Sequence, residues 1–176
     1  MKKSLKTEAL VLKKKYLLGK NLLLTLFTQN YGKITVLAYG IKNIKSRRLS
    51  HIETSNLIIA LIEKKAGRYY LKETQLISAF SLIKKEALKL KFLYFFLFIL
   101  DRILPENQKE EKAYLITKKF LIDLSCDDNF NSNKFFKYQN KILMILGYLQ
   151  KKLKEKNLSL FIEELIDEKI PPFLKV

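Results

Sequence analysis

The spacing of the apolar residues changes near Phe80, and this change constrains the fold more than any other feature of the sequence. From Thr7 to Ser78 the apolar residues alternate with polar ones or form short β-branched runs, which is the pattern of β-strands. Beyond Phe80 they recur at the spacing of one face of an α-helix. The sequence therefore predicts two domains, a β domain over residues 1–78 and a helical domain over residues 79–176.

Five strands fit the first domain, and glycines at positions 19, 32 and 67 mark tight turns, because glycine tolerates positive φ. One connection, GIKNIKSRRLSH, is long and basic. Five short antiparallel strands with one long loop predict a closed barrel of the OB type, since closure removes exposed strand edges. An open five-stranded sheet packed on a helix is the alternative. The expected strands are Glu8–Lys13, Leu22–Thr28, Lys33–Tyr39, Thr54–Ile62 and Arg68–Leu76.

The second domain is expected to be an α-helical bundle. Its first long helix, from Ala87 to Leu104, is apolar on almost all sides, and Pro105 ends it. Asn107 followed by Glu110 fits the start of the next helix, with a side-chain cap and a carboxylate near the positive end of the helix dipole. The three further helices are expected to bury three apolar stripes: Ala113, Ile116, Phe120 and Leu124; Phe135, Tyr138, Ile142, Ile145 and Leu149; and Leu158, Phe161, Ile162, Leu165 and Ile166.

The charge of the chain is strongly basic and unevenly distributed. Lys and Arg number 34 against 17 Asp and Glu, a formal net charge of +17. Residues 1–78 hold 16 basic and 4 acidic side chains, whereas residues 79–176 hold 18 and 13. A lysine-rich composition throughout would not by itself produce this difference. An anionic partner, in particular a nucleic acid, is therefore expected to bind the first domain.

The sequence offers no set of reactive side chains typical of an enzyme. The single histidine, His51, adjoins the basic loop, and the single cysteine, Cys126, precedes two aspartates that disfavour its thiolate. One cysteine also excludes an internal disulfide framework and a cysteine cluster for a metal ion. We therefore expect a binding protein that is not an enzyme and has no cofactor and no small-molecule substrate.

Membrane insertion and export are not expected. The most apolar run, FLYFFLFIL, is far shorter than the roughly 20 residues that a transmembrane helix needs. Glu8 and the lysines at positions 13 to 15 interrupt the N-terminal segment before the apolar core of a signal peptide can form. The chain is expected to be cytoplasmic, without a membrane partner.

The basic loop and the tyrosines near it form the candidate nucleic-acid site. In proteins that bind single strands, cations contact phosphates and aromatic rings stack on bases. Such binding is largely independent of base sequence, because phosphate contacts carry no sequence information. Tyr16, Tyr69 and Tyr70 are further possible platforms. The main candidates for phosphate contact are Lys33, Lys42, Lys45, Arg47 and Arg48, and those for stacking are Tyr31 and Tyr39.

Several segments resemble bacterial RecO proteins, the recombination mediators, and they occur in the expected order. They are TEALVLKKK, LLLTLFTQNYGKITVLAYGIKNIKSRRL, LDRILPE, FFKYQNKILMILGY and a closing FLK, which together span nearly the whole chain. The resemblance implies an OB domain followed by a helical domain. It also implies DNA repair by the RecF pathway, in which the protein anneals complementary strands and loads recombinase onto strands coated by single-stranded DNA-binding protein.

The resemblance further implies two protein partners, RecR and the acidic, apolar-ended tail of single-stranded DNA-binding protein. The helical domain is expected to bind the tail, with Lys118 and Lys119, or Lys137 and Lys141, beside an apolar pocket. Many RecO proteins carry four zinc-binding cysteines after the segment corresponding to LGY. Here LQKKLKEKN follows instead, so no zinc is expected.

Two other functions fit the residues themselves. A basic OB protein that binds ribosomal or transfer RNA would share the same electrostatics. A protein-interaction scaffold without direct DNA binding would owe its charge to composition alone. Competition among single-stranded DNA, duplex DNA and structured RNA separates these functions.

Overall fold

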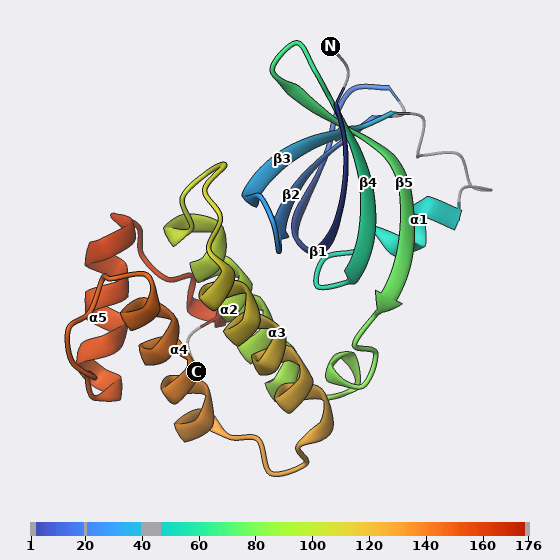
Figure 1. Cartoon of the computed structure of the whole chain (residues 1–176). Helices are drawn as coiled ribbons and strands as arrows, with labels where there is room; N and C mark the ends of the chain where they lie inside the picture. The colour runs from blue at the N-terminus through green and yellow to red at the C-terminus, as the bar shows by residue number, and fades with distance from the viewer. Residues whose placement is uncertain (1–2, 20, 40–46, 175–176) are drawn as a thin grey trace. The chain divides into compact units, whose positions relative to one another are not determined.

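The computed structural model describes residues 3–19, 21–39 and 47–174, with the side chains of Lys3, Arg47 and Arg48 left undescribed (Figure 1). The chain forms two compact units. The first unit comprises Met1–Ala79 together with Pro105–Glu110, and the second comprises Phe80–Leu104 and Glu111–Val176. The short segment Pro105–Glu110 therefore belongs to the first unit although the helices on either side of it belong to the second.

The first unit is a closed barrel of five strands. Its strands are β1 (Lys3–Tyr16), β2 (Leu22–Thr28), β3 (Gly32–Ala38), β4 (Leu57–Lys65) and β5 (Arg68–Ser78). The spatial order is β1-β2-β3-β5-β4, and the ring closes because β1 also pairs with β4. A five-stranded Greek-key barrel is the OB architecture. The predicted fold class, an OB-type barrel followed by helices, is confirmed.

One pair of strands differs from the expectation that all five are antiparallel. Strands β3 and β5 are parallel, with Val36 opposite Tyr69 and Leu37 opposite Tyr70. The reason is geometric. In a closed ring with an odd number of strands, neighbours cannot alternate in direction all the way round, so one adjacent pair must be parallel. The sequence pattern of each strand carries no sign of this.

Strand β1 is much longer than the predicted Glu8–Lys13 because it serves two partners. Its first half pairs with β4 from Lys3 to Leu10, and its second half pairs with β2 from Ala9 to Tyr16. The register with β2 shifts between Val11 and Lys13, which marks a bulge that bends the strand. This bend allows one strand to close the ring.

The fourth strand begins at Leu57, three residues later than the predicted Thr54. A short helix, α1 (Arg47–His51), precedes it, and the chain then turns with Ser55 at φ 76°. The Asn56 side chain holds this turn by donating to the carbonyls of Ser50 and His51, at 2.9 and 3.0 Å. Polar side chains that bond the local backbone favour turns over strands, which explains the late start.

Inward-facing aliphatic side chains from all five strands fill the barrel. The second strand matches the predicted Leu22–Thr28 at both ends, and its alternate residues are buried as expected for a barrel. Tyr31, Leu49 and Tyr69 are partly buried and pack against this core. The buried core residues are Leu5, Ala9, Val11, Leu22, Leu24, Leu26, Ile34, Val36, Ala38, Ile52, Ile58, Ala60, Ile62 and Leu71.

The second unit packs its helices around a cluster of phenylalanines. Its helices are α2 (Ala87–Ile103), α3 (Glu111–Cys126), α4 (Ser132–Ile145) and α5 (Glu155–Ile166). The rings of Phe96 and Phe120 lie 4.1 Å apart, and those of Phe92 and Phe135 lie 4.8 Å apart. Such aromatic pairs stabilise a core beyond the apolar area that they bury. The predicted stripe Ala113, Ile116, Phe120 and Leu124 is buried, as expected. Leu149, in contrast, lies beyond the end of α4.

Asn107 does not begin a helix, contrary to the prediction. Helix α3 starts at Glu111, and Asn107 adopts a left-handed conformation with φ 58°. Its backbone N–H donates to the carbonyl of Lys33 at 2.8 Å. The backbone of Asn107 is therefore hydrogen-bonded to the barrel. We call the segment Pro105–Glu110, which contains Asn107, the strap.

The strap lies along the part of β3 that has no partner in β5. Only Val36 and Leu37 of β3 pair with β5, whereas Lys33 forms a parallel bridge with Glu106 of the strap. An unpaired strand edge exposes backbone groups that need hydrogen-bond partners, and the strap supplies one. Lys33 is consequently only 8% exposed.

Gly32 permits the strap to approach the barrel. It has φ +70°, and a Cβ placed on it would lie 1.7 Å from the backbone oxygen of Gln108. A side chain here would therefore collide with the backbone of the strap. Gly67 has a similar φ of +74°, but no atom lies within 4 Å of the position that a Cβ on it would take. It provides a matched comparison for the backbone conformation alone.

We predict that Gly32→Ala destabilises the protein more than Gly67→Ala does. Both variants force alanine into the left-handed region, at a cost of about 1–2 kcal/mol. Only Gly32→Ala adds the collision with the Gln108 backbone, which should lower the free energy of unfolding by about 1–3 kcal/mol more, as overpacking does. Urea unfolding followed by circular dichroism measures the difference, and hydrogen exchange at the Asn107 amide should accelerate only in Gly32→Ala. Equal losses of stability with an unchanged Asn107 amide would contradict this role of the strap.

Candidate nucleic-acid interface

A tight turn between β4 and β5 lies at one end of the barrel (Figure 1). It carries three cations, Lys64, Lys65 and Arg68. Lys65 and Arg68 pair across a two-residue loop in which Ala66 and Gly67 have φ 47° and 74°. Two positive φ values in a two-residue loop define a type I′ turn, whose twist matches the twist of the flanking strands. All five residues of this hairpin tip, Lys64–Arg68, are exposed.

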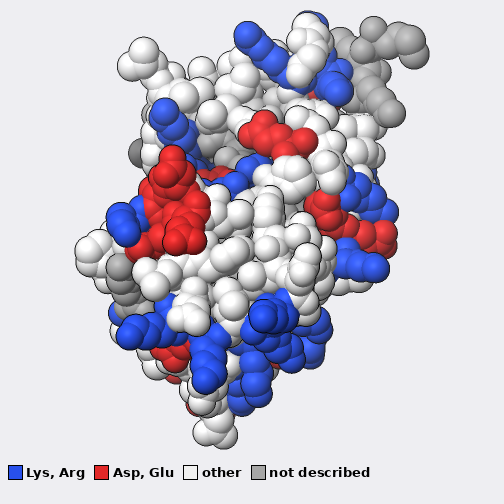
Figure 2. Space-filling view, turned by 90° about the vertical axis from the view of Figure 1, so that its left-hand side faces the viewer, with Lys and Arg blue, Asp and Glu red and all other residues white. Residues whose placement is uncertain are grey.

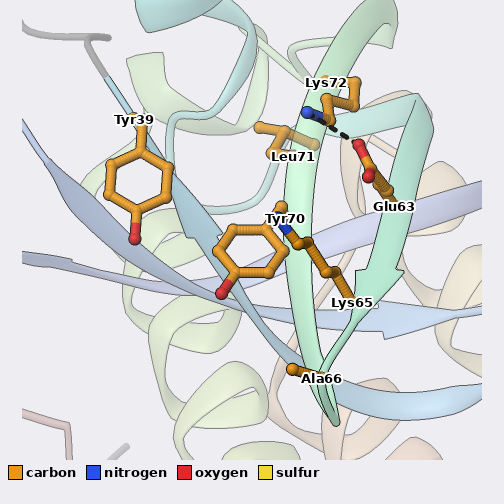
Figure 3. A pocket seen from close by; sticks show the side chains of 7 residues that line it. All are labelled: Tyr39, Glu63, Lys65, Ala66, Tyr70, Leu71 and Lys72. Carbon is orange, nitrogen blue, oxygen red and sulfur yellow. Dashed lines mark ion pairs between the residues drawn. The ribbon is translucent and has the colours of Figure 1, made fainter. Parts of the chain in front are cut away.

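A pocket with two tyrosines lies on one side of the hairpin tip (Figure 3). The rings of Tyr39 and Tyr70 are stacked, with centroids 5.8 Å apart and planes 16° from parallel. Tyr39 is 53% exposed, so much of its ring remains open to solvent. This tyrosine pocket has a volume of about 470 Å³ and is lined by Tyr39, Glu63, Lys65, Ala66, Tyr70, Leu71 and Lys72.

A second pocket lies on the other side of the same tip. Leu23, Thr35 and Leu37 contribute to it from β2 and β3. The Lys64 ammonium lies 5.0 Å from the centre of the Tyr69 ring, within range of a cation–π interaction. This strand pocket has a volume of about 420 Å³, and its remaining lining residues are Lys64, Gly67, Arg68, Tyr69, Glu106 and Asn107.

The cations around the two pockets differ in whether a carboxylate neutralises them. Lys72 pairs with Glu63 at 2.8 Å. Lys65 and Arg68 form no ion pair with any residue that the structure describes. The charge of the hairpin tip is therefore available to an external anion.

Lys14, on β1, is an example of a cation already engaged within the protein. Its ammonium lies 2.6 Å from a carboxylate oxygen of Glu53. Burial acts to lower the pKa of Lys14, but the hydrogen bond and the negative charge of Glu53 outweigh burial and raise the pKa. Lys14 therefore stays protonated at neutral pH, and its charge is largely balanced by the protein itself.

Charged side chains are also unevenly distributed over the surface. Figure 2 shows basic and acidic side chains gathered in several separate groups on one face of the molecule. Within the described residues, no group of three or more His, Cys, Asp or Glu side chains could hold a metal ion. None of the described helices is long and apolar enough to cross a membrane.

The tyrosine pocket contains one of the predicted site residues, Tyr39. Tyr31 is partly buried and packs against the barrel core, and Lys33 lies beside the strap. Arg47 and Arg48 begin α1, but their side chains are not described. Lys42 and Lys45 lie outside the described residues. His51 is held structurally, with Nδ1 3.1 Å from the Thr74 hydroxyl.

Sequence reasoning missed the cations of the hairpin tip, Lys64, Lys65 and Arg68. In the sequence, the run KKAGR predicts only a tight turn at Gly67. Its signal was nonetheless present, since three cations flank the turn and two tyrosines follow directly. Basic side chains interleaved with aromatic rings are the combination that binds single strands.

The four lysines predicted to bind a partner tail lie on the helical unit. Lys119 is exposed and pairs with Asp123 at 3.3 Å, whereas Lys118 is half-buried. Lys137 and Lys141 are exposed on α4. The apolar residues expected beside Lys118 and Lys119, which are Ile116 and Phe120, are buried. They belong to the core of the helical unit and do not offer a surface pocket.

Comparison with known proteins identifies the family. Residues 1–80 match the family model described as Recombination protein O N terminal. The DNA repair protein RecO of Caldanaerobacter subterraneus subsp. tengcongensis is 32% identical over 145 residues, which is 82% of this chain and 59% of that protein. The DNA repair protein RecO of a Thermoanaerobacter species is 32% identical over 148 residues, 82% of this chain and 58% of that protein.

The chain belongs to the RecO family. The resemblance noted in the sequence is thereby confirmed. The match to the family model covers the five strands of the barrel, which carry the hairpin tip, the tyrosine pocket and every lining residue of the strand pocket except Glu106 and Asn107. The chain spans less than two thirds of the length of the two RecO relatives.

Proposed function

We propose that this chain is a DNA repair protein of RecO type that binds single-stranded and duplex DNA through its barrel. It anneals complementary strands and helps to load recombinase onto DNA coated by single-stranded DNA-binding protein. One observation carries the proposal: a barrel of OB topology presents unneutralised cations between two pockets with aromatic walls. The family of the chain and the names of its relatives support the same function.

Phosphate contact at the hairpin tip explains how the barrel binds DNA of any sequence. Lys65 and Arg68 face each other across the turn, so both can approach one phosphodiester backbone. The predicted loop residues Lys42, Lys45, Arg47 and Arg48 are proposed to extend this contact along the backbone. Cations neutralise phosphates and release counterions, which provides affinity without reading bases.

Annealing follows from the same charge. Two complementary strands repel each other, and a protein surface that neutralises phosphates reduces this repulsion. Residues 1–78 hold 16 basic and 4 acidic side chains, so the barrel can contact more than one strand. Lys33 and Tyr31 are proposed only as secondary contacts, because Lys33 is buried and Tyr31 is half-buried.

Protein partners complete the proposal. RecR and the tail of single-stranded DNA-binding protein are proposed to bind this chain, the tail through the helical unit. Since Ile116 and Phe120 are buried, the apolar end of the tail needs another surface near Lys118 and Lys119. Leu115 and Ile122 are 53% and 46% exposed, and they share a face of α3 with Lys119. Lys137 and Lys141 on α4 remain the second proposed position.

We predict that replacing Lys64, Lys65 and Arg68 by alanine weakens DNA binding equally for different base sequences. Each lost phosphate contact should reduce the slope of log affinity against log salt by about 0.7 to 0.9. Titration of labelled DNA at several salt concentrations measures this slope. A matched variant in which Lys151, Lys152 and Lys156 of the helical unit become alanine removes the same charge and should change the slope little. An unchanged slope in the hairpin variant would remove the tip from the interface.

We also predict that the chain accelerates annealing of complementary oligonucleotides coated with single-stranded DNA-binding protein. The hairpin-tip variant should anneal more slowly, because annealing depends on the same phosphate contacts. Fluorescence energy transfer between labelled strands reports the rate. Absence of acceleration by the wild-type chain, or stronger binding to structured RNA than to either form of DNA, would contradict the proposed function.

A further inference from the structure

We propose that the hairpin tip separates two base-binding pockets, and that an unpaired DNA strand crosses the tip with one base in each pocket. This inference rests on the proposed function, since it specifies how the same barrel surface holds a single strand. Tyr39, Tyr70 and Tyr69 contact the bases, whereas Lys65 and Arg68 contact the phosphates.

The tyrosine pocket has the shape and chemistry of a site for one base. Tyr39 and Tyr70 form a nearly parallel stack, and the exposed side of that stack can extend by one more flat ring. Lys72 in this pocket is paired with Glu63, whereas Lys65 forms no ion pair with a described residue, so a phosphate attached to the stacked base meets the charge of Lys65 (Figure 3). Aromatic stacking accepts every base, because every base has a flat π face.

The strand pocket offers a second base aliphatic and aromatic walls. Leu23 and Leu37 lie opposite each other on β2 and β3, and Tyr69 adds an aromatic wall. Tyr69 also packs against the barrel core, which fixes its position. Glu106 and Asn107 of the strap supply polar atoms at this pocket, so a base can both bury its face and form hydrogen bonds there.

The two pockets are neighbours because of the strand register. Leu37 lines the strand pocket and is paired with Tyr70, which lines the tyrosine pocket. Lys65 lines one pocket and Arg68 lines the other, and these two residues pair across the turn. A strand that places bases on both sides of the tip must therefore carry its backbone over these two cations.

Only an unpaired strand can use both pockets. In a duplex each base face is covered by its neighbours, and reaching a protein ring requires the base to leave the stack. Duplex DNA can still contact the cations of the tip through its phosphates. The tyrosines should therefore matter for single strands alone, whereas the cations should matter for both forms.

The test compares the full chain on oligothymidylate and on an oligomer of the same length whose sugars lack bases. The wild-type chain should bind oligothymidylate at least about fivefold more tightly, since stacking of one base gives this much or more. Tyr39→Ala with Tyr70→Ala should weaken binding of oligothymidylate and leave binding of the abasic oligomer and of duplex DNA unchanged. Tyr39→Phe with Tyr70→Phe should keep wild-type affinity, because the rings remain.

Tyr94→Ala provides the matched control, because Tyr94 is an exposed tyrosine of α2 in the helical unit. It should leave all three affinities unchanged. Equal wild-type affinity for oligothymidylate and the abasic oligomer would overturn the inference while leaving phosphate binding intact. Equal loss for both oligomers in the alanine double variant would also overturn it. Failure of the wild-type chain to bind either oligomer or duplex would sink the proposed function itself.

Discussion

A closed ring of five strands requires one parallel pair, and the position of the candidate site depends on where that pair falls. It falls between β3 and β5, with Leu37 opposite Tyr70. This register places Tyr39, just beyond the end of β3, against the Tyr70 ring. It also brings the β4–β5 turn beside the pairing of β3 with β5. The hairpin tip then has one pocket on each side. The geometry that closes the barrel thus also assembles a basic and aromatic surface suited to DNA.

The strap is a second consequence of the short pairing between β3 and β5. The pairing of β3 with β5 is confined to Val36 and Leu37, and the strap bonds to Lys33 further along the strand. Gly32 is needed because the Gln108 backbone occupies the space that a side chain would fill. The strap thereby bonds to the edge of β3 at Lys33 and adds Glu106 and Asn107 to the strand pocket.

The sequence predicted the features that depend on local residue pattern. It did not predict the hydrogen bonds between backbone groups that lie far apart along the chain. Alternation located β2 to the residue, and the helical stripe of Ala113, Ile116, Phe120 and Leu124 was correct. The parallel pairing and the bond from Asn107 to Lys33 join distant backbone atoms, which leave no side-chain signal. Tyr39 was identified as a candidate because it adjoins the basic loop. The cations of the hairpin tip were missed because a charged turn is ordinary on a protein surface.

Photo-crosslinking of single-stranded DNA to the full chain tests the central claim most directly, namely that the hairpin tip and its two pockets hold the strand. Oligonucleotides containing iodouracil react with aromatic side chains that contact the base, and mass spectrometry of the digested complex locates the linked residues. The account predicts crosslinks to Tyr39, Tyr69 and Tyr70. Crosslinks confined to the helices α2 to α5, with none in the barrel, would contradict it.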